Sequence, residues 1–102
     1  MANEKTIKEK MRDAKTGYIY RIYTENINRG KLEKLTGEYF EGFTVINAVG
    51  YWQGIKEKSV IIEIIGDREN LGKIKELATH IKINNKQSAV LIQIEKNRRV
   101  MI

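Results

Sequence analysis

The alternation of apolar and polar positions along the chain predicts four strands and two helices. Residues 18–25 are rich in aromatic and β-branched side chains, which favour a strand. Further strands are expected at 43–52, 59–65 and 88–95, with a loop at 53–58 between the second and the third. Apolar residues at helical spacing predict one helix at 29–40 and another that runs from the capping residue Asp67 to the Asn pair at 84–85.

The order of these elements, β-α-β-β-α-β, is that of the ferredoxin-like fold of the α+β class. It predicts a four-stranded antiparallel sheet with both helices on one face. Because the chain has 102 residues and shows no internal linker, we expect a single domain over residues 17–102. Residues 1–16 are polar, with Ile7 and Met11 as the only apolar anchors, and are expected to form a flexible N-terminal arm.

Both faces of the predicted sheet carry apolar residues. In the third strand one face has Val60, Ile62 and Ile64, and the other has Ile61, Glu63 and Ile65. Two helices cover only one face, and a second apolar face open to water would be unusual on a monomer. We therefore expect this second face to pack against other copies of the chain. Cover by the N-terminal arm is the alternative.

Glu63 stands out because it interrupts an apolar run in an expected central strand. A buried carboxylate is costly unless it meets a cation or a hydrogen-bond donor. One interpretation is a salt bridge to Arg21 or to a lysine of a neighbouring strand. The other is a carboxylate in a cleft between subunits that holds a cationic ligand. The sequence alone leaves both interpretations open.

The composition excludes several kinds of chemistry. With no Cys and one His, the chain has no thiolate nucleophile, no zinc–thiolate site and no multi-His metal site within one subunit. We therefore expect no metal. The apolar runs are far shorter than the ~20 residues that span a membrane, and no secretory signal is visible. The expected location is the cytoplasm.

The net charge of +6 is large enough to attract nucleic acid or other anions. Most basic residues alternate with acidic ones, however, and only Arg98 and Arg99 form an adjacent pair. An RNA-recognition sheet needs aromatic residues on its third strand, which is aliphatic here. Nucleic acid is therefore not an expected partner. No P-loop or Rossmann glycine motif is present, and His80 is expected to be an exposed helix residue.

Tyr51 and Trp52 lie where the second strand enters a glycine-containing loop, a place that often lines a ligand cleft. The segment 42–54, Gly-Phe-Thr-Val-Ile-Asn-Ala-Val-Gly-Tyr-Trp-Gln-Gly, resembles the PII-like proteins. This resemblance implies a trimer whose open sheet faces pack together and whose ligands, usually nucleotides, bind between subunits. The long regulatory loop of PII proteins is reduced here to residues 53–58, and residues 84–88 replace their glycine-rich phosphate-binding segment.

A narrower resemblance covers residues 18–95, which are similar to the phage-encoded lyases that degrade S-adenosylmethionine (SAM). It rests on four segments of this sequence: Tyr-Thr-Glu-Asn, Phe-Glu-Gly-Phe-Thr-Val, Gly-Tyr-Trp-x-Gly and Ile-Ile-Glu-Ile-Ile. The resemblance implies a PII-like trimer that converts SAM to methylthioadenosine and homoserine lactone between subunits, without a cofactor. In a phage this activity would deplete host SAM and blunt methylation-dependent restriction.

The resemblance also implies roles for residues. Tyr51 would orient the substrate carboxylate, with Trp52 as its rival, and Glu63 would hold the ammonium or sulfonium charge. The substrate-binding candidates are Gly42, Phe43, Thr44, Trp52 and Tyr20. Two other functions stay open: a non-enzymatic PII-like protein that binds a nucleotide as a regulator or a defence-signal sponge, and a basic module that binds nucleic acid or a host protein.

Overall fold

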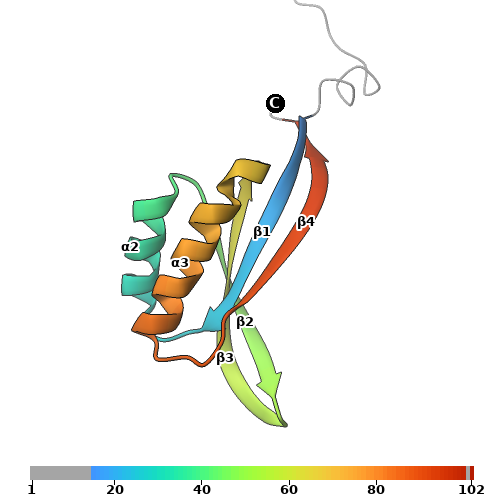
Figure 1. Cartoon of the computed structure of the whole chain (residues 1–102). Coiled ribbons are helices and arrows are strands. Elements are labelled where there is room, and N and C mark those ends of the chain that lie inside the picture. The colour runs from blue at the N-terminus through green and yellow to red at the C-terminus, as the bar shows by residue number, and fades with distance from the viewer. Residues whose placement is uncertain (1–14, 101) are drawn as a thin grey trace, which may run out of the picture.

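The computed structural model describes residues 15–100 and 102, which form one four-stranded antiparallel sheet with a layer of helices on one face (Figure 1). The elements in chain order are β1 (Lys15–Glu25), α2 (Arg29–Tyr39), β2 (Thr44–Trp52), β3 (Ile55–Gly66), the 3₁₀ turn η1 (Arg68–Asn70), α3 (Leu71–Asn84) and β4 (Leu91–Arg99). The strand order in the sheet is β2-β3-β1-β4. The predicted ferredoxin-like βαββαβ fold is therefore confirmed.

The register places β1 at the centre of the sheet. Tyr20 pairs with Ile64 of β3 on one side and with Ile94 of β4 on the other. Paired residues share a face of the sheet, so the alternation along β1 and β3 sorts the side chains into two sets. One set points toward the helices and forms the core together with side chains of α2 and α3: Tyr20, Ile22, Leu32, Val60, Ile62, Ile64, Ile74, Leu77, Ala78 and Ile81.

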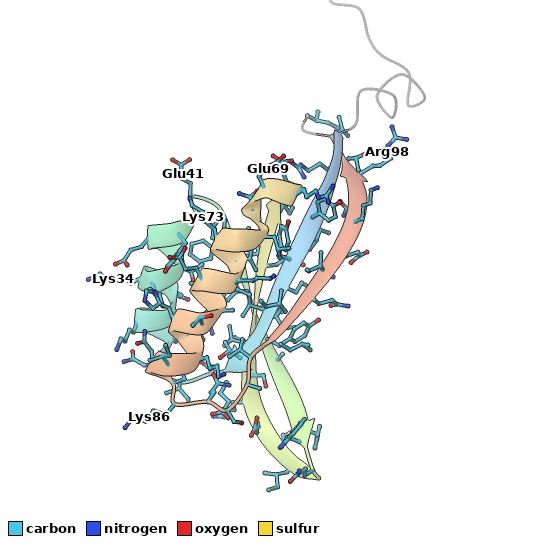
Figure 2. The ribbon with its side chains drawn as sticks, in the orientation of Figure 1. Lys34, Glu41, Glu69, Lys73, Lys86 and Arg98 are labelled. Atoms are coloured by element: carbon cyan, nitrogen blue, oxygen red, sulfur yellow. The ribbon has the colours of Figure 1, made fainter. Side chains whose placement is uncertain are left out.

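A polar residue precedes each of the two helices. Asn28 precedes α2 in the left-handed conformation, with φ 46°, and its side chain accepts a hydrogen bond from the backbone N–H of Lys31. Before α3, the backbone N–H of Asp67 donates to Oδ1 of Asn70 at 2.7 Å. Asp67 therefore ends β3 as expected, but η1 separates it from the α-helix. Charged side chains such as Lys34, Lys73 and Glu69 project from the exposed side of this layer (Figure 2).

Three of the four strands are longer than the hydrophobic pattern predicts. β3 begins at Ile55, so the expected loop at 53–58 is a two-residue turn in which Gln53 and Gly54 have φ of 49° and 79°. Positive φ at both central residues is typical of a type I′ hairpin. β4 begins at Leu91 rather than at residue 88 and continues beyond the expected end at residue 95 to Arg99.

The N-terminal boundary also differs from the prediction. β1 begins at Lys15, so Lys15 and Thr16 belong to the strand and not to the arm. In the strand they pair with Arg99 and Arg98 of β4. Backbone hydrogen bonds can extend a strand through polar residues, which a search for apolar alternation misses. The rest of the predicted arm, residues 1–14, lies outside the described residues.

The hairpin formed by β2 and β3 projects beyond the helices, as Figure 1 shows at the end of the sheet opposite the C-terminus. This gives the described molecule an elongated outline, 55 × 29 × 22 Å. The tip of the hairpin therefore lies far from the core. No helix in the described part of the chain is long and apolar enough to cross a membrane.

Candidate functional site

The sheet face opposite the helices, which we call the open face, is apolar over much of its area. It carries alternate residues of each strand, including Ile19 and Tyr23 of β1 and Ile61 and Ile65 of β3. The most exposed of its aliphatic side chains along the body of the sheet are Ile46, Ile65 and Leu91, at 40%, 57% and 63%. The prediction that both sheet faces are apolar is confirmed.

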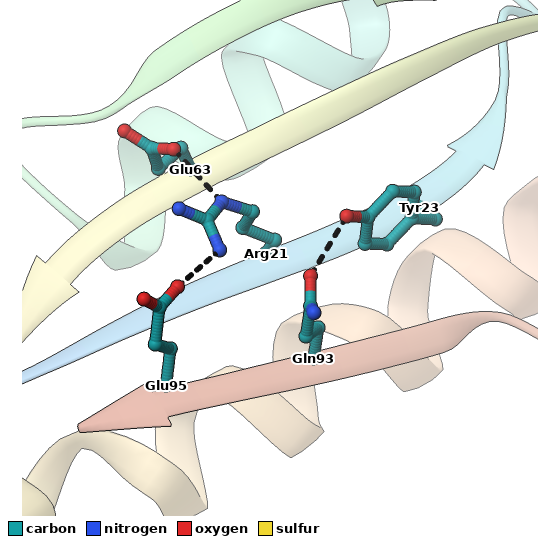
Figure 3. A network of polar contacts seen from close by, with 5 residues as sticks. All are labelled: Arg21, Tyr23, Glu63, Gln93 and Glu95. Atoms are coloured by element: carbon teal, nitrogen blue, oxygen red, sulfur yellow. Dashed lines mark hydrogen bonds and ion pairs between the residues drawn. The ribbon is translucent and has the colours of Figure 1, made fainter.

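A charged network lies at the middle of the open face (Figure 3). Nε of Arg21 donates to Glu63 Oε2 at 3.0 Å, and its Nη1 donates to Glu95 Oε2 at 2.7 Å. Hydrogen bonds to Glu95 and, next, to Glu63 raise the pKa of the Arg21 guanidinium above its usual value. Beside this network, the hydroxyl of Tyr23 donates to Oε1 of Gln93 at 2.8 Å.

The structure decides what Glu63 contacts within one chain. Arg21 is its direct cross-strand partner, and the two side chains are each 24% exposed. The predicted salt bridge to Arg21 is therefore confirmed, and Glu63 is partly accessible rather than fully buried. Glu95 is a site residue that the sequence reasoning missed. It pairs with Ile19 and reaches Arg21 diagonally. Because β4 also contains Gln93 and a run of polar residues after Glu95, the sequence pattern does not single Glu95 out.

The two candidate aromatic residues lie far from Glu63 in the same chain. Trp52 pairs with Ile55 of β3, and Glu63 lies eight residues further along the same strand. Trp52 and Glu63 are therefore about 26 Å apart. The register places Trp52 on the face of Glu63 and Tyr51 on the opposite one. Both side chains are well exposed, at 70% for Tyr51 and 67% for Trp52.

The remaining substrate-binding candidates are divided between surface and core. Thr44 lies beside Glu63 across β2 and β3 and is exposed, and Gly42 is exposed just before it. Phe43 instead packs against the core. Tyr20 is 1% exposed, and its hydroxyl donates to the carbonyl of Asp67 at 2.7 Å. Its burial makes Tyr20 a structural residue in this chain, so we do not retain it as a substrate contact.

Within the described residues, no group of three His, Cys, Asp or Glu side chains is placed to hold a metal ion. His80 is exposed on α3, as expected, and its Nδ1 lies 2.8 Å from the hydroxyl of Tyr39. This pair joins α2 to α3 on the side of the molecule away from the open face. The charged network on the open face therefore remains the most distinctive cluster of polar groups.

Comparison with known proteins identifies the fold. No protein family model and no curated protein matches the chain. Among solved structures, the chain is similar to CPII, a nitrogen regulatory PII-like protein from Thiomonas intermedia K12 bound to ADP, AMP and bicarbonate. The TM-score is 0.65 at 11% identity, over 87% of this chain and 98% of that one.

Two further structures show the same likeness. The Bacillus subtilis GlnK–ATP complex has a TM-score of 0.59 at 17% identity, over 80% of this chain and 82% of that one. A phage SAM lyase in the apo state has a TM-score of 0.58 at 19% identity, over 84% of this chain and 90% of that one. At these identities the likeness establishes the fold alone: a ferredoxin-like βαββαβ fold in its PII-like form.

Proposed function

We propose that this chain is a SAM lyase that acts as a homotrimer, with active sites between subunits on the open face. It converts SAM to methylthioadenosine and homoserine lactone without a cofactor, in the cytoplasm of a bacterial host. There it would serve as a phage counter-restriction enzyme by depleting the methyl donor. The fold shared with a phage SAM lyase supports this proposal, as does the resemblance of residues 18–95 to that enzyme family.

The observation that carries the proposal is the charge of the network on the open face. Two carboxylates, Glu63 and Glu95, share one guanidinium, which leaves a formal charge of −1. The whole chain, in contrast, carries +6. A local negative charge on a partly apolar face suits a ligand with a net positive charge, such as SAM, whose ammonium and sulfonium outnumber its carboxylate.

The reaction requires little of the protein. A carboxylate oxygen of the substrate attacks its own γ-carbon, the bond from that carbon to sulfur breaks, and the bonding pair stays on sulfur in neutral methylthioadenosine. No proton is transferred. Folding the substrate into the attacking conformation is the main task, and such positioning is worth roughly 7–11 kcal/mol in favourable cases.

SAM carries three charged groups, and the change of each charge during the reaction indicates which group Glu63 should pair with. The carboxylate and the sulfonium both lose their charge at the transition state, whereas the ammonium keeps its charge throughout. Pairing Glu63 with the sulfonium would stabilise the substrate more than the transition state and slow the reaction. We therefore assign Glu63 to the ammonium, with Thr44 beside it as a contact for the amino-acid end of the substrate.

The aromatic candidates Tyr51 and Trp52 reach this site only from another copy of the chain. Tyr51 and Trp52 lie on a hairpin that projects beyond the helices, and about 26 Å of strand separates Trp52 from Glu63 of its own chain. In the proposed trimer the hairpin of one subunit lies over the open face of the next. Tyr51 would orient the carboxylate there, or Trp52 would cover the cation.

Purified protein incubated with SAM tests the proposal. Chromatography should detect methylthioadenosine together with homoserine lactone; homoserine instead of lactone would indicate a hydrolase. Glu63→Gln is expected to lower kcat/KM for SAM about 100-fold or more, mainly through a higher KM, since it removes a charge that pairs with the ammonium both in the bound substrate and in the transition state. Glu76→Gln, an exposed change on α3, is the matched control and should retain activity. No product at micromolar wild-type enzyme would reject the proposal.

The second candidate function is a non-enzymatic PII-like protein that binds a nucleotide as a regulator or a sponge. The observation that favours it is that the similar CPII and GlnK structures contain ADP and AMP or ATP. A thermal-shift panel of nucleotides separates the two functions. Stabilisation by a nucleotide, without any loss of SAM from the mixture, would support the second candidate over the lyase.

A further inference from the structure

The hydrogen bonds of Arg21 leave part of its guanidinium unused. This group has five N–H donors in a rigid planar fork. Nε is engaged by Glu63 and Nη1 by Glu95, while Nη2 makes no hydrogen bond to any residue that the structure describes. In Figure 3, Glu63 and Glu95 approach the guanidinium from its two sides, from β3 and β4. The two glutamates therefore fix the orientation of the guanidinium, while its Nη2 donors remain available to a ligand.

We infer that Arg21 binds the carboxylate of the substrate through its unused donors, so that the network recognises both charges of an α-amino acid. The inference rests on the proposed function, because it concerns the substrate of that site. Glu63 takes the ammonium, and Arg21, whose side chain is 24% exposed on the same face, takes the carboxylate beside it. The part of the substrate that the network recognises is thus its α-amino acid end.

The two neighbouring carboxylates give Arg21 a fixed orientation before the ligand arrives. A free arginine side chain loses about 2 kcal/mol of rotamer entropy when a ligand immobilises it. Here charged hydrogen bonds on Nε and Nη1 have already restricted the guanidinium. A carboxylate that binds Nη2 with one oxygen keeps its other oxygen available for the attack.

The charge changes of the reaction predict how Arg21 contributes. The carboxylate loses its charge as the lactone forms, so its bond to Arg21 is stronger in the bound substrate than in the transition state. An interaction of that kind tightens substrate binding and, like an anion beside the sulfonium, opposes the chemical step. The cost to kcat is small here, because Nη2 holds one carboxylate oxygen and leaves the attacking oxygen free. Arg21 is therefore a binding residue for the substrate, and its loss should appear in KM rather than in kcat.

The first experiment measures two unreactive ligands that differ only in the carboxylate: S-adenosylhomocysteine and its decarboxylated form. Isothermal calorimetry with the wild-type protein should give a Kd about tenfold or more lower for the carboxylated ligand, the factor expected from one charged hydrogen bond. This comparison needs no variant, so it stands even if a substitution at Arg21 disturbs folding. A ratio below about threefold would overturn the inference.

The second experiment uses variants. Arg21→Gln should reduce the ratio of the two Kd values to below about threefold, and should raise KM for SAM about tenfold while kcat changes less than about threefold. Arg29→Gln, which removes a guanidinium paired with Glu33 on α2, is the matched control and should change neither quantity. A ratio that survives in the folded Arg21→Gln variant would also overturn the inference.

The two proposals fail in different ways. Wild-type protein that produces methylthioadenosine but binds both ligands equally would overturn the role of Arg21 and leave the lyase intact. Wild-type protein that neither consumes SAM nor binds either ligand would reject the lyase proposal, and the assignment of Arg21 with it.

Discussion

Tyr20 illustrates how one residue can be read in two ways from the sequence. Its aromatic ring made it a candidate for substrate contact, but it lies in the core, 1% exposed, with its hydroxyl bonded to the carbonyl of Asp67. That bond links β1 to the turn before α3. A buried hydroxyl with a good acceptor contributes about 1 kcal/mol to stability, because its partner would otherwise be unsatisfied.

We expect Tyr20→Phe to lower the free energy of unfolding by about 1 kcal/mol near neutral pH. Urea denaturation of the wild type and the variant at the same protein concentration measures this difference in the free energy of unfolding. Burial, and then the nearby Tyr18, Glu69 and Asp67, raise the pKa of Tyr20 above its value in the unfolded chain. Its contribution should therefore be complete below about pH 10 and should decrease as the pH rises further. A wild-type advantage that stays constant above pH 10 would contradict this account.

The charged network also shows that the role of an acidic residue depends on its neighbours in the folded chain. Sequence reasoning identified Glu63 and offered Arg21 as one partner, but the diagonal contact with Glu95 depends on the register of β1 with β4. A shift of one residue would place Glu95 on the helix side. The net charge of the network therefore depends on strand pairing, which residue type alone does not reveal.

At the scale of elements, the β2–β3 hairpin departs most from the prediction. A loop was expected at 53–58, whereas the strands continue to a two-residue turn at Gln53 and Gly54. The turn requires positive φ at both positions, which glycine adopts without a steric penalty. Gly54 is therefore the residue that allows the hairpin to be tight.

Gly54→Ala is expected to destabilise the protein by about 1 kcal/mol, because alanine is strained at a φ of 79°. Gly72→Ala is the matched control. Gly72 lies in α3 with open space around the position of a new Cβ, so alanine should stabilise the helix by about 0.5–1 kcal/mol. Urea midpoints of the two variants should move in opposite directions, and a Gly54→Ala midpoint at or above that of the wild type would show that the turn imposes no constraint.

At the scale of the whole molecule, the open face is the dominant feature. It combines exposed isoleucine and leucine side chains with a charged centre, whereas the helices cover only the opposite face. An uncovered apolar surface of this kind favours self-association. This is the physical basis of the proposed trimer and of the proposed site between its subunits.

We predict that Ile65→Lys prevents self-association and leaves each chain folded, because the side chain is 57% exposed at the edge of the open face. Ile83→Lys is the matched control, an isoleucine 65% exposed on α3. In sedimentation velocity, the wild type and the control should have about three times the 11.9 kDa mass of one chain. The Ile65→Lys variant should have about the mass of a single chain. A wild-type protein that sediments as a monomer would refute the prediction.

The pattern of apolar residues was sufficient to predict the kinds of element, their order and the two-layer fold, because burial of alternate or helically spaced side chains depends on local sequence. It located Asp67 before the second helix and both apolar faces of the sheet. It failed at the ends of strands. Lys15 and Arg99 are polar, yet they pair through backbone hydrogen bonds that leave no trace in hydrophobicity.

The sequence by itself determined the class of the fold, the presence of an uncovered apolar face and the absence of thiol chemistry. Only the tertiary structure decided which polar groups meet: Glu63 and Glu95 come from strands that are distant in the chain, and Arg21 joins them because β1 lies between β3 and β4. It also separated Trp52 from Glu63 by the length of the hairpin. Such contacts depend on register and strand order, which are set by the packing of the whole sheet.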